Sequence, residues 1–314
     1  MSNRRSISGA AWVKIIIVLA LCLMVLTAFT VGTVGSCSFS SPLQNRPIFT
    51  MGNHNWQVGS GTKDVDTLRE IQLQWAYGDV TIVATSGNAI EIIDHATSSA
   101  TADQVHWAIE NGILYVLSNE PRISSTCSPV WRHHSCEIRI PQRLLQGLNT
   151  TSLTLASGSI TLSSFQSTAL RVEIASGDFN ADKVEARTAN INVASGNLYA
   201  TAFVVDTLKL ELASGRVNIA GAFKDITTTT ASGILSISSS IAPTRIKAEM
   251  ASGTATFSFP APADGFTAKV SKLSGRFNCG FTTTQSGGNT YINGNGAAQY
   301  DFNVASGTIN LNPA

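Results

Sequence analysis

Hydrophobic and polar residues alternate through the second half of the chain in short runs that recur about every 19 residues. Each run has two halves: Val172 and Ile174 precede a small-residue turn, for example, and Phe179 and Ala181 follow it. Alternation with period two predicts strands with one face turned inward. A repeat of this length is too short for paired helices and fits one coil of a β-solenoid. The pattern therefore predicts regular all-β coils over 151–314.

Each turn is marked by a Ser-Gly dipeptide, usually within Ala-Ser-Gly, and the serines are separated by 19, 19, 19, 18, 20, 22 and 32 residues. A corner repeated in every coil needs a residue that tolerates positive φ and has no Cβ to meet the coil above. We assign these corners a structural role, because no histidine follows His134 to serve as the base of a serine nucleophile. The predicted corner residues are Gly78, Ser157, Gly158, Ser176, Gly177, Ser195, Gly196, Ser214, Gly215, Ser232, Gly233, Ser252, Gly253, Ser274, Gly275, Ser306 and Gly307.

Two further patterns complete the description of a coil. Another apolar residue recurs eight or nine positions after several serines, at Phe165, Val184, Phe223 and Ile241, and we expect it to form a third short wall. The longest interval contains a Gly- and Asn-rich segment, 282–299, which predicts a loop or hairpin.

Charged residues on the outward face before the corners come in basic-acidic pairs two positions apart. The pairs alternate with neutral coils, which predicts a solvated, charge-balanced face. The acidic members form the best candidate column for a polysaccharide lyase or hydrolase, although each has a basic neighbour that explains it as an ion pair. The pairs are Arg171 with Glu173, Lys209 with Glu211, and Lys247 with Glu249.

Residues 67–150 begin with the same pattern around Tyr77-Gly78 and then become irregular. Strand-like segments at 91–94 and 136–141 flank an Asn111-Gly112 pair, which is a strong hairpin signal. We expect this portion to cap one end of the solenoid, because its strand edges would otherwise be unpaired.

An apolar run near the amino terminus predicts a membrane anchor. Residues 15–34 carry no charge and would reach about 30 Å as a helix, the thickness of a bilayer core. The basic residues lie before this run, which places the amino terminus in the cytoplasm and the bulk of the chain outside. A cleaved signal peptide and lipidation at Cys37 are the alternatives. The predicted organisation is a cytoplasmic tail (1–14), a single transmembrane helix (15–35), a stalk (36–66) and a β-solenoid ectodomain (67–314).

Cysteine usage and composition agree with an extracytoplasmic location. Cys127 and Cys136 flank a polar excursion, and we expect them to form a disulfide in an oxidising compartment. A metal site that also uses His133 and His134, or two unpaired thiols, are the alternatives. Charged residues make up 13% of the chain and the net charge is +1, with no basic stripe, so we expect no nucleic-acid partner. No cofactor or obligatory metal is expected.

The order of several weak signals resembles a bacterial "putative adhesin" family, a domain of unknown function in envelope proteins. The residues that carry the resemblance are Gly78-Asp79-Val80, Asn111-Gly112, Ile138-Arg139-Ile140-Pro141 and the Ser-Gly corners. It covers about residues 66–314 and implies a single-stranded, right-handed β-solenoid at the cell surface. It supplies no catalytic residues, and the excursion between Cys127 and Cys136 departs from the family's plainer strands.

These observations favour a non-enzymatic, single-pass cell-membrane protein that presents a rigid solenoid to a surface glycan or protein. An accessory or sensor protein of envelope-stress signalling is the second hypothesis, and a polysaccharide lyase or hydrolase is the third.

Overall fold

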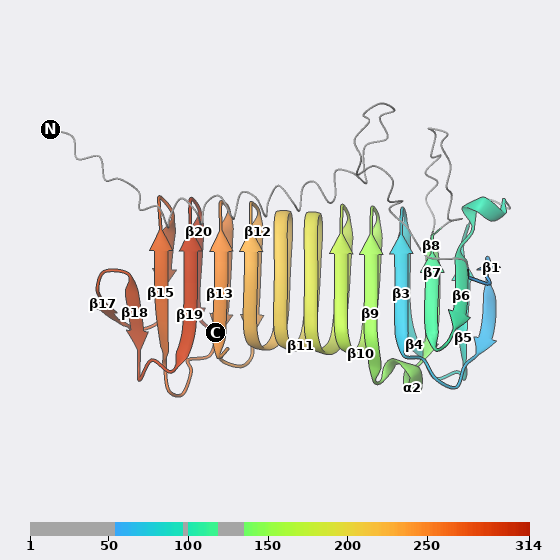
Figure 1. The fold of residues 1–314 in the computed structure, drawn as a ribbon, viewed down its shortest axis with the longest axis horizontal. Coiled ribbons are helices and arrows are strands. Elements are labelled where there is room, and N and C mark those ends of the chain that lie inside the picture. Colours follow the sequence, from blue (N-terminus) through green and yellow to red (C-terminus); the bar gives the residue numbers. More distant parts are fainter. Residues whose placement is uncertain (1–53, 97–99, 119–134) are drawn as a thin grey trace, which may run out of the picture.

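The computed structural model describes residues 54–96, 100–118 and 135–314. Most of these residues are in β-strands, and the described ranges contain one 3-10 helix, η1 (Thr101–Asp103), and one short α-helix, α2 (Gln142–Leu145). The strands lie side by side in a long stack (Figure 1). The predicted all-β, solenoid-like architecture is confirmed. Across these three ranges, no helix is long and apolar enough to cross a bilayer.

Several predictions concern residues outside the described ranges. These are the cytoplasmic tail, the transmembrane helix at 15–35, the stalk as far as residue 53, Cys127, and the His133-His134 pair. They stay predictions.

The central coils each contribute one strand before and one strand after a Ser-Gly corner. Parallel pairing shifted by 19 residues sets Ile160 beside Phe179 and Ile174 beside Val193. We call the strands that precede the corners the pre-corner wall and those that follow them the post-corner wall. The strands of this region, two of which run through several bends, are β9 (Leu148–Leu155), β10 (Ser159–Ile174), β11 (Asp178–Thr230), β12 (Ile234–Ser239), β13 (Arg245–Met250) and β14 (Thr254–Phe259).

The inward residues of the two walls form one continuous hydrophobic core. Ile174 and Val193 are register partners and are fully buried, and Leu212 in the next coil is buried as well. Burial of one such side chain contributes roughly 1.5–3 kcal/mol, so the core grows with every added coil. Alternation in the sequence therefore identifies the inner face of these strands.

The Ser-Gly corners stack so closely that a side chain at the glycine has no room. Gly177 has φ +125°, and a Cβ placed on it would lie 2.3 Å from the carbonyl oxygen of Gly158. The backbone N–H of Asp178 donates to the same oxygen at 2.8 Å. A left-handed φ occurs at the first seven predicted corner glycines, Gly78, Gly158, Gly177, Gly196, Gly215, Gly233 and Gly253.

The last two corner glycines differ from the others. Gly275 and Gly307 do not have a left-handed φ. A Cβ on Gly275 would lie 2.3 Å from the Val304 side chain, and one on Gly307 would lie 2.7 Å from the Gly253 carbonyl oxygen. Close packing, and not backbone conformation, requires glycine at these two corners.

Each coil has a second corner, at the end of its post-corner strand, and in three successive coils the residue at this corner is not glycine. Ser164, Lys183 and Ala202 have φ of 54°, 53° and 50° there. A left-handed conformation costs an ordinary residue about 1–2 kcal/mol, so packing of the coil imposes it. This second corner could not be found from the sequence, because its residues differ in every coil.

The apolar residues that follow this second corner agree in part with the predicted third wall. Phe165, Val184 and Phe223 are buried, but Ile241 is 40% exposed and was wrongly included. Ser239 in the same coil is buried, and its hydroxyl donates to the carbonyl oxygen of Ile241 at 2.7 Å. The hydroxyl closes the turn, which leaves the isoleucine side chain outside.

The coils at the C-terminal end do not stack in chain order. β19 (Ala298–Val304) lies between β13 and β15 (Phe266–Lys272). β20 (Thr308–Pro313) likewise lies between β14 and β16 (Arg276–Cys279). The last coil is therefore inserted between two earlier coils, as Figure 1 shows for β19.

The Gly- and Asn-rich segment forms the predicted hairpin, and the hairpin covers the pre-corner wall at this end. β17 (Thr284–Ser286) and β18 (Thr290–Asn293) pair antiparallel. β18 in turn pairs antiparallel with β15.

The N-terminal end shows the same interleaving. β3 (Glu70–Trp75) lies between β7 (Ile113–Leu117) and β9. β4 (Asp79–Thr85) lies between β8 (Ser135–Pro141) and β10. The first and the last coils of the chain are thus each one layer inside the stack.

The remaining strands cover the N-terminal end. β6 (His106–Glu110) and β7 form the predicted hairpin through Asn111 and Gly112, whose φ are 53° and 75°. β5 (Ala89–Asp94) pairs antiparallel with β8. The predicted strands are therefore present, although the chain does not wind through them in sequence order.

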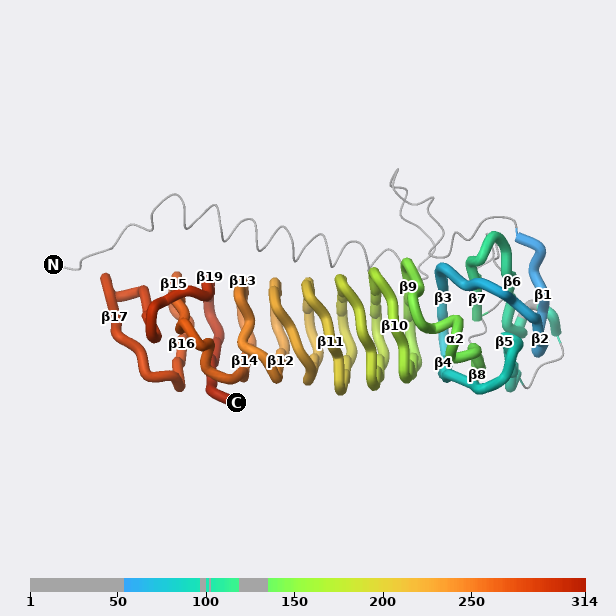
Figure 2. Tube along the Cα trace, turned by 90° about the horizontal axis from the view of Figure 1, so that it is seen from below, coloured from blue at the N-terminus to red at the C-terminus, as the bar shows by residue number. Residues whose placement is uncertain are grey.

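A strap formed by residues 54–64 crosses this end and pairs with both walls (Figure 2). β1 (Gln57–Val58) pairs with β6, and β2 (Gly61–Asp64) pairs with β5. Between them, the indole N–H of Trp107 donates to the Gly59 carbonyl oxygen at 3.0 Å. The second half of the predicted stalk is therefore part of the sheet.

Candidate interaction surfaces

The predicted corner serines form a row along one edge of the stack. Their backbones bond from coil to coil, as where the Ser195 N–H donates to the Ala175 carbonyl oxygen at 2.9 Å. The Ser274 hydroxyl donates to the Ala305 carbonyl oxygen at 3.1 Å. The described histidines are in the N-terminal cap and its strap, far along the chain from the regular coils. The serine row therefore has the contacts of a turn and lacks a base in its own coils.

The pre-corner wall carries a ladder of ion pairs on its outer face. Within single coils, Nε of Arg171 lies 3.0 Å from Glu173, Nζ of Lys209 lies 2.7 Å from Glu211, and Nζ of Lys247 lies 3.1 Å from Glu249. Coils without charge at these positions separate the pairs. Each carboxylate of the candidate lyase or hydrolase column is thus paired with a basic side chain of its own coil. The arrangement is that of a charge-balanced surface.

The inserted last coil adds a carboxylate to this face. Asp301 is the register partner of Lys247 on one side and of Lys269 on the other. Chain order would have placed the two lysines in adjacent strands, where like charges destabilise a sheet. The alternation along the chain does not show this relationship, because it does not specify which coils are neighbours in the stack.

The post-corner wall carries a different ladder, made of hydroxyl, amide and carboxylate groups that bond from coil to coil. The Asn197 amide donates to Asp178 at 2.8 Å, and the Thr201 hydroxyl donates to Asp182 at 2.7 Å. Nearer the C-terminal end, the Asn310 amide donates to the Thr256 hydroxyl at 3.3 Å. These bonds hold outward side chains in a fixed row, with adjacent strands about 4.8 Å apart.

Two large apolar side chains stand out of this polar wall. Tyr199 is 39% exposed and Ile234 is 45% exposed. Arg216 is exposed and is the register partner of Ile234. An aromatic ring and an arginine among fixed polar groups are typical of binding surfaces. The outward position of these residues follows from the alternation, but the alternation does not indicate that they share one surface.

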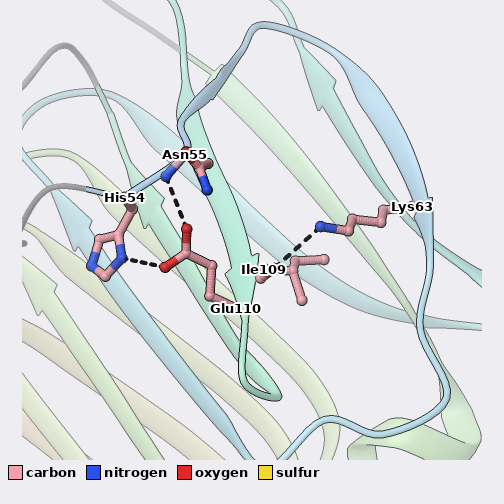
Figure 3. A network of polar contacts seen from close by, with 5 residues as sticks. All are labelled: His54, Asn55, Lys63, Ile109 and Glu110. Atoms are coloured by element: carbon pink, nitrogen blue, oxygen red, sulfur yellow. Dashed lines mark hydrogen bonds and ion pairs between the residues drawn. The ribbon is translucent and has the colours of Figure 1, made fainter.

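The N-terminal strap is held by a cluster around Glu110 (Figure 3). The Glu110 carboxylate accepts from the Asn55 backbone N–H and lies against Nδ1 of His54, both at 2.9 Å. These two contacts, the backbone bond first, lower the pKa of Glu110. The His54 ring stacks on Tyr115 with centroids 3.9 Å apart, and the Lys63 ammonium donates to the Ile109 carbonyl oxygen at 3.1 Å.

The predicted disulfide involves one described residue. Cys136 is buried in the core, and burial raises the pKa of its thiol. It forms no disulfide with a described residue. Cys127 lies outside the described ranges, so the pairing stays a prediction. Within those ranges, no three His, Cys, Asp or Glu side chains are grouped to hold a metal ion.

Comparison with solved structures finds distant likenesses. A "putative cell adhesion protein" from Clostridium sporogenes is 14% identical, with a TM-score of 0.29, and the match covers 82% of this chain and 100% of that one. A "putative adhesin" from Bacteroides fragilis is 9% identical, with a TM-score of 0.41 and coverage of 82% and 97%. A "putative lipid binding protein" from Parabacteroides distasonis is 14% identical, with a TM-score of 0.46 and coverage of 83% and 98%.

No curated protein matches this chain. A family model described as Toastrack DUF4097 matches residues 67–312, which include both walls, the interleaved coils at both ends and every predicted Ser-Gly corner. The chain therefore belongs to the Toastrack DUF4097 family.

Proposed function

We propose that this protein is a non-enzymatic envelope protein, anchored by residues 15–35, whose post-corner wall binds a surface glycan. The apolar run and the charge asymmetry around it support the anchor and the extracytoplasmic location. The names of the structurally similar proteins agree with a surface-interaction role at a coarse level.

The observation that carries the proposal is the set of coil-to-coil side-chain bonds on the post-corner wall. Asn197 with Asp178, Thr201 with Asp182, and Asn310 with Thr256 are each fixed by a neighbour in the next coil. Side chains held in place before binding lose little conformational entropy on contact with a partner. A row of such groups suits an extended ligand that offers a hydroxyl or amide at every step.

The composition of this wall favours a glycan over a highly charged polymer. Its ladder is mainly hydroxyl and amide groups, whereas the ion pairs of Arg171, Lys209 and Lys247 lie on the pre-corner wall. Tyr199 offers an exposed ring on which the apolar face of a sugar can pack.

Binding of the full-length protein in nanodiscs to extracted wall polysaccharide tests the proposal. Tyr199→Ser should weaken binding at least about tenfold, the effect of losing one aromatic anchor. Ile241→Ser is the matched control, because Ile241 is equally exposed but lies beyond the post-corner wall. Arg216→Ser and Lys209→Ser compare opposite walls of one coil, and only the first should weaken binding.

Equal effects of Tyr199→Ser and Ile241→Ser would overturn the assignment to this wall. If the nanodisc-bound protein binds an envelope protein but does not bind the polysaccharide, the assignment to a glycan is overturned.

A further inference from the structure

A groove interrupts the regular stack where α2 meets the second corner of the first coils. It has a volume of about 290 Å³ and is lined by α2 and its C-terminal flank on one side and by two successive coils on the other. This volume is just below the roughly 300–1,000 Å³ that is usual for small-molecule sites. The groove is therefore large enough for a small ligand or one unit of a polymer.

The wall made by α2 is fixed in place. Leu144 and Leu145 are buried in the core. The Arg143 guanidinium donates to the carbonyl oxygens of Val65 at 2.8 Å, Asp66 at 3.0 Å and Asn88 at 3.2 Å. α2 contacts β10, β8 and β4, and Figure 2 shows it beside β4 and β8. Both sides of the groove therefore belong to one packed unit.

The groove presents neutral hydrogen-bonding groups and one pair of opposite charges. Gln142 and Gln146 line the side of α2, and Gln166, Lys183 and Glu185 line the coils. The Gln166 amide donates to the Glu185 carboxylate at 3.1 Å. The three amides and the lysine donate hydrogen bonds, and the amides and the glutamate accept them.

The shape of the chain at the second corner determines where these groups point. Lys183 has a left-handed φ of 53°, as has Ser164 in the preceding coil. Gln166 and Glu185 are paired in register, so that their side chains lie side by side. Phe165 and Leu145 close the bottom of the groove and are buried.

We propose that this groove is a binding site for an uncharged carbohydrate unit. Alternating donors and acceptors match the hydroxyl groups of a sugar, each of which both donates and accepts. One lysine beside one glutamate gives no net charge, which disfavours polyanionic ligands. The proposal takes its ligand class from the proposed function but uses residues that lie outside the post-corner wall.

The experiment uses full-length protein in nanodiscs, titrated with cellotetraose, chitotetraose and maltotetraose, and with a galacturonate trimer as the anionic probe. We expect saturable binding of at least one neutral probe and weaker binding of the anionic one. Lys183→Asn and Gln166→Leu should each lower the affinity for the neutral probe about tenfold, which is the effect of one lost hydrogen bond to a bound group. Asparagine at 183 keeps a residue that tolerates the left-handed conformation.

Ala202→Asn is the matched control, because Ala202 occupies the same left-handed corner one coil further along and does not line the groove. It should bind like the unmodified protein, and melting temperatures should show that all three variants fold. Absence of saturable binding, or equal binding by all three variants, would overturn the site. Loss of binding in Tyr199→Ser with full binding in Lys183→Asn and Gln166→Leu would reject the groove and retain the wall.

Discussion

Lys247 on β13 lies beside Asp301 on β19 in the register of the pre-corner wall, although the two residues are far apart in the sequence. On its other side Asp301 faces Lys269 of β15. The inserted coil thus separates two ammonium groups with a carboxylate. In sequential stacking the lysines would be direct neighbours.

Reversing the charge of Asp301 should destabilise the fold. Asp301→Lys places three cations in adjacent strands, and we expect a loss of about 1 kcal/mol in the free energy of unfolding by urea at low salt. Asp301→Asn should lose less, and added salt should reduce the difference between the two variants. Identical stability of the Lys and Asn variants would contradict the register.

Two C-terminal deletions test the interleaved order more directly. Removing 298–314 takes away β19 and β20 and leaves β16 without its strand partner, because β16 pairs with β20. Removing 263–314 takes away β15 to β20 and leaves β13 and β14 as the last coil. We expect the shorter deletion to be the more damaging one, measured by thermal melting and limited proteolysis. Sequential stacking predicts the reverse order.

Substitution of a corner glycine should be far more costly than substitution of a glycine in open space. Gly177→Ala combines a φ of +125° with a Cβ 2.3 Å from the Gly158 oxygen, and we expect a loss of roughly 2–5 kcal/mol. Gly287→Ala is the control, because Gly287 has φ +61° and nothing within 4 Å of the added Cβ. Its loss should be about 1 kcal/mol in the same urea titration. Similar losses for both variants would show that stacking adds nothing to backbone strain.

Attachment of the N-terminal strap should weaken in acid. The Asn55 N–H and His54 lower the pKa of Glu110 below its ordinary value of 4.5. A lowered pKa in the folded state means that the stabilisation is complete above pH 4.5 and is lost as pH falls through the folded value. Hydrogen exchange of residues 54–64, corrected for intrinsic rates, should therefore speed up in that range.

Glu110→Gln provides the control for this pH effect. The glutamine is isosteric and does not titrate, so exchange of the strap should be faster at neutral pH and no longer change in acid. The same acid response in the variant would show that another group is responsible.

The sequence alone determined the coil. Alternation around Ser-Gly predicts which residues of β10 to β14 face inward, and Ile174 and Val193 are buried partners as expected. Asn111-Gly112 likewise predicts its hairpin, because few residues adopt the required left-handed pair of conformations. These features are local or repeat at a fixed period, and so they can be predicted from the amino-acid sequence alone.

Only the tertiary structure decided the order of the end coils, the second corner and the groove. All coils share one alternation and present similar edges, so the hydrophobic pattern allows any coil to stack on any other. The choice depends on contacts between distant residues. Phe302 of the inserted strand packs between Phe257 and Phe277, with ring centroids 6.0 and 5.1 Å apart, and Asp301 lies between two lysines. Those contacts have no period in the sequence, and for that reason the pattern could define the coil but not the arrangement of the coils.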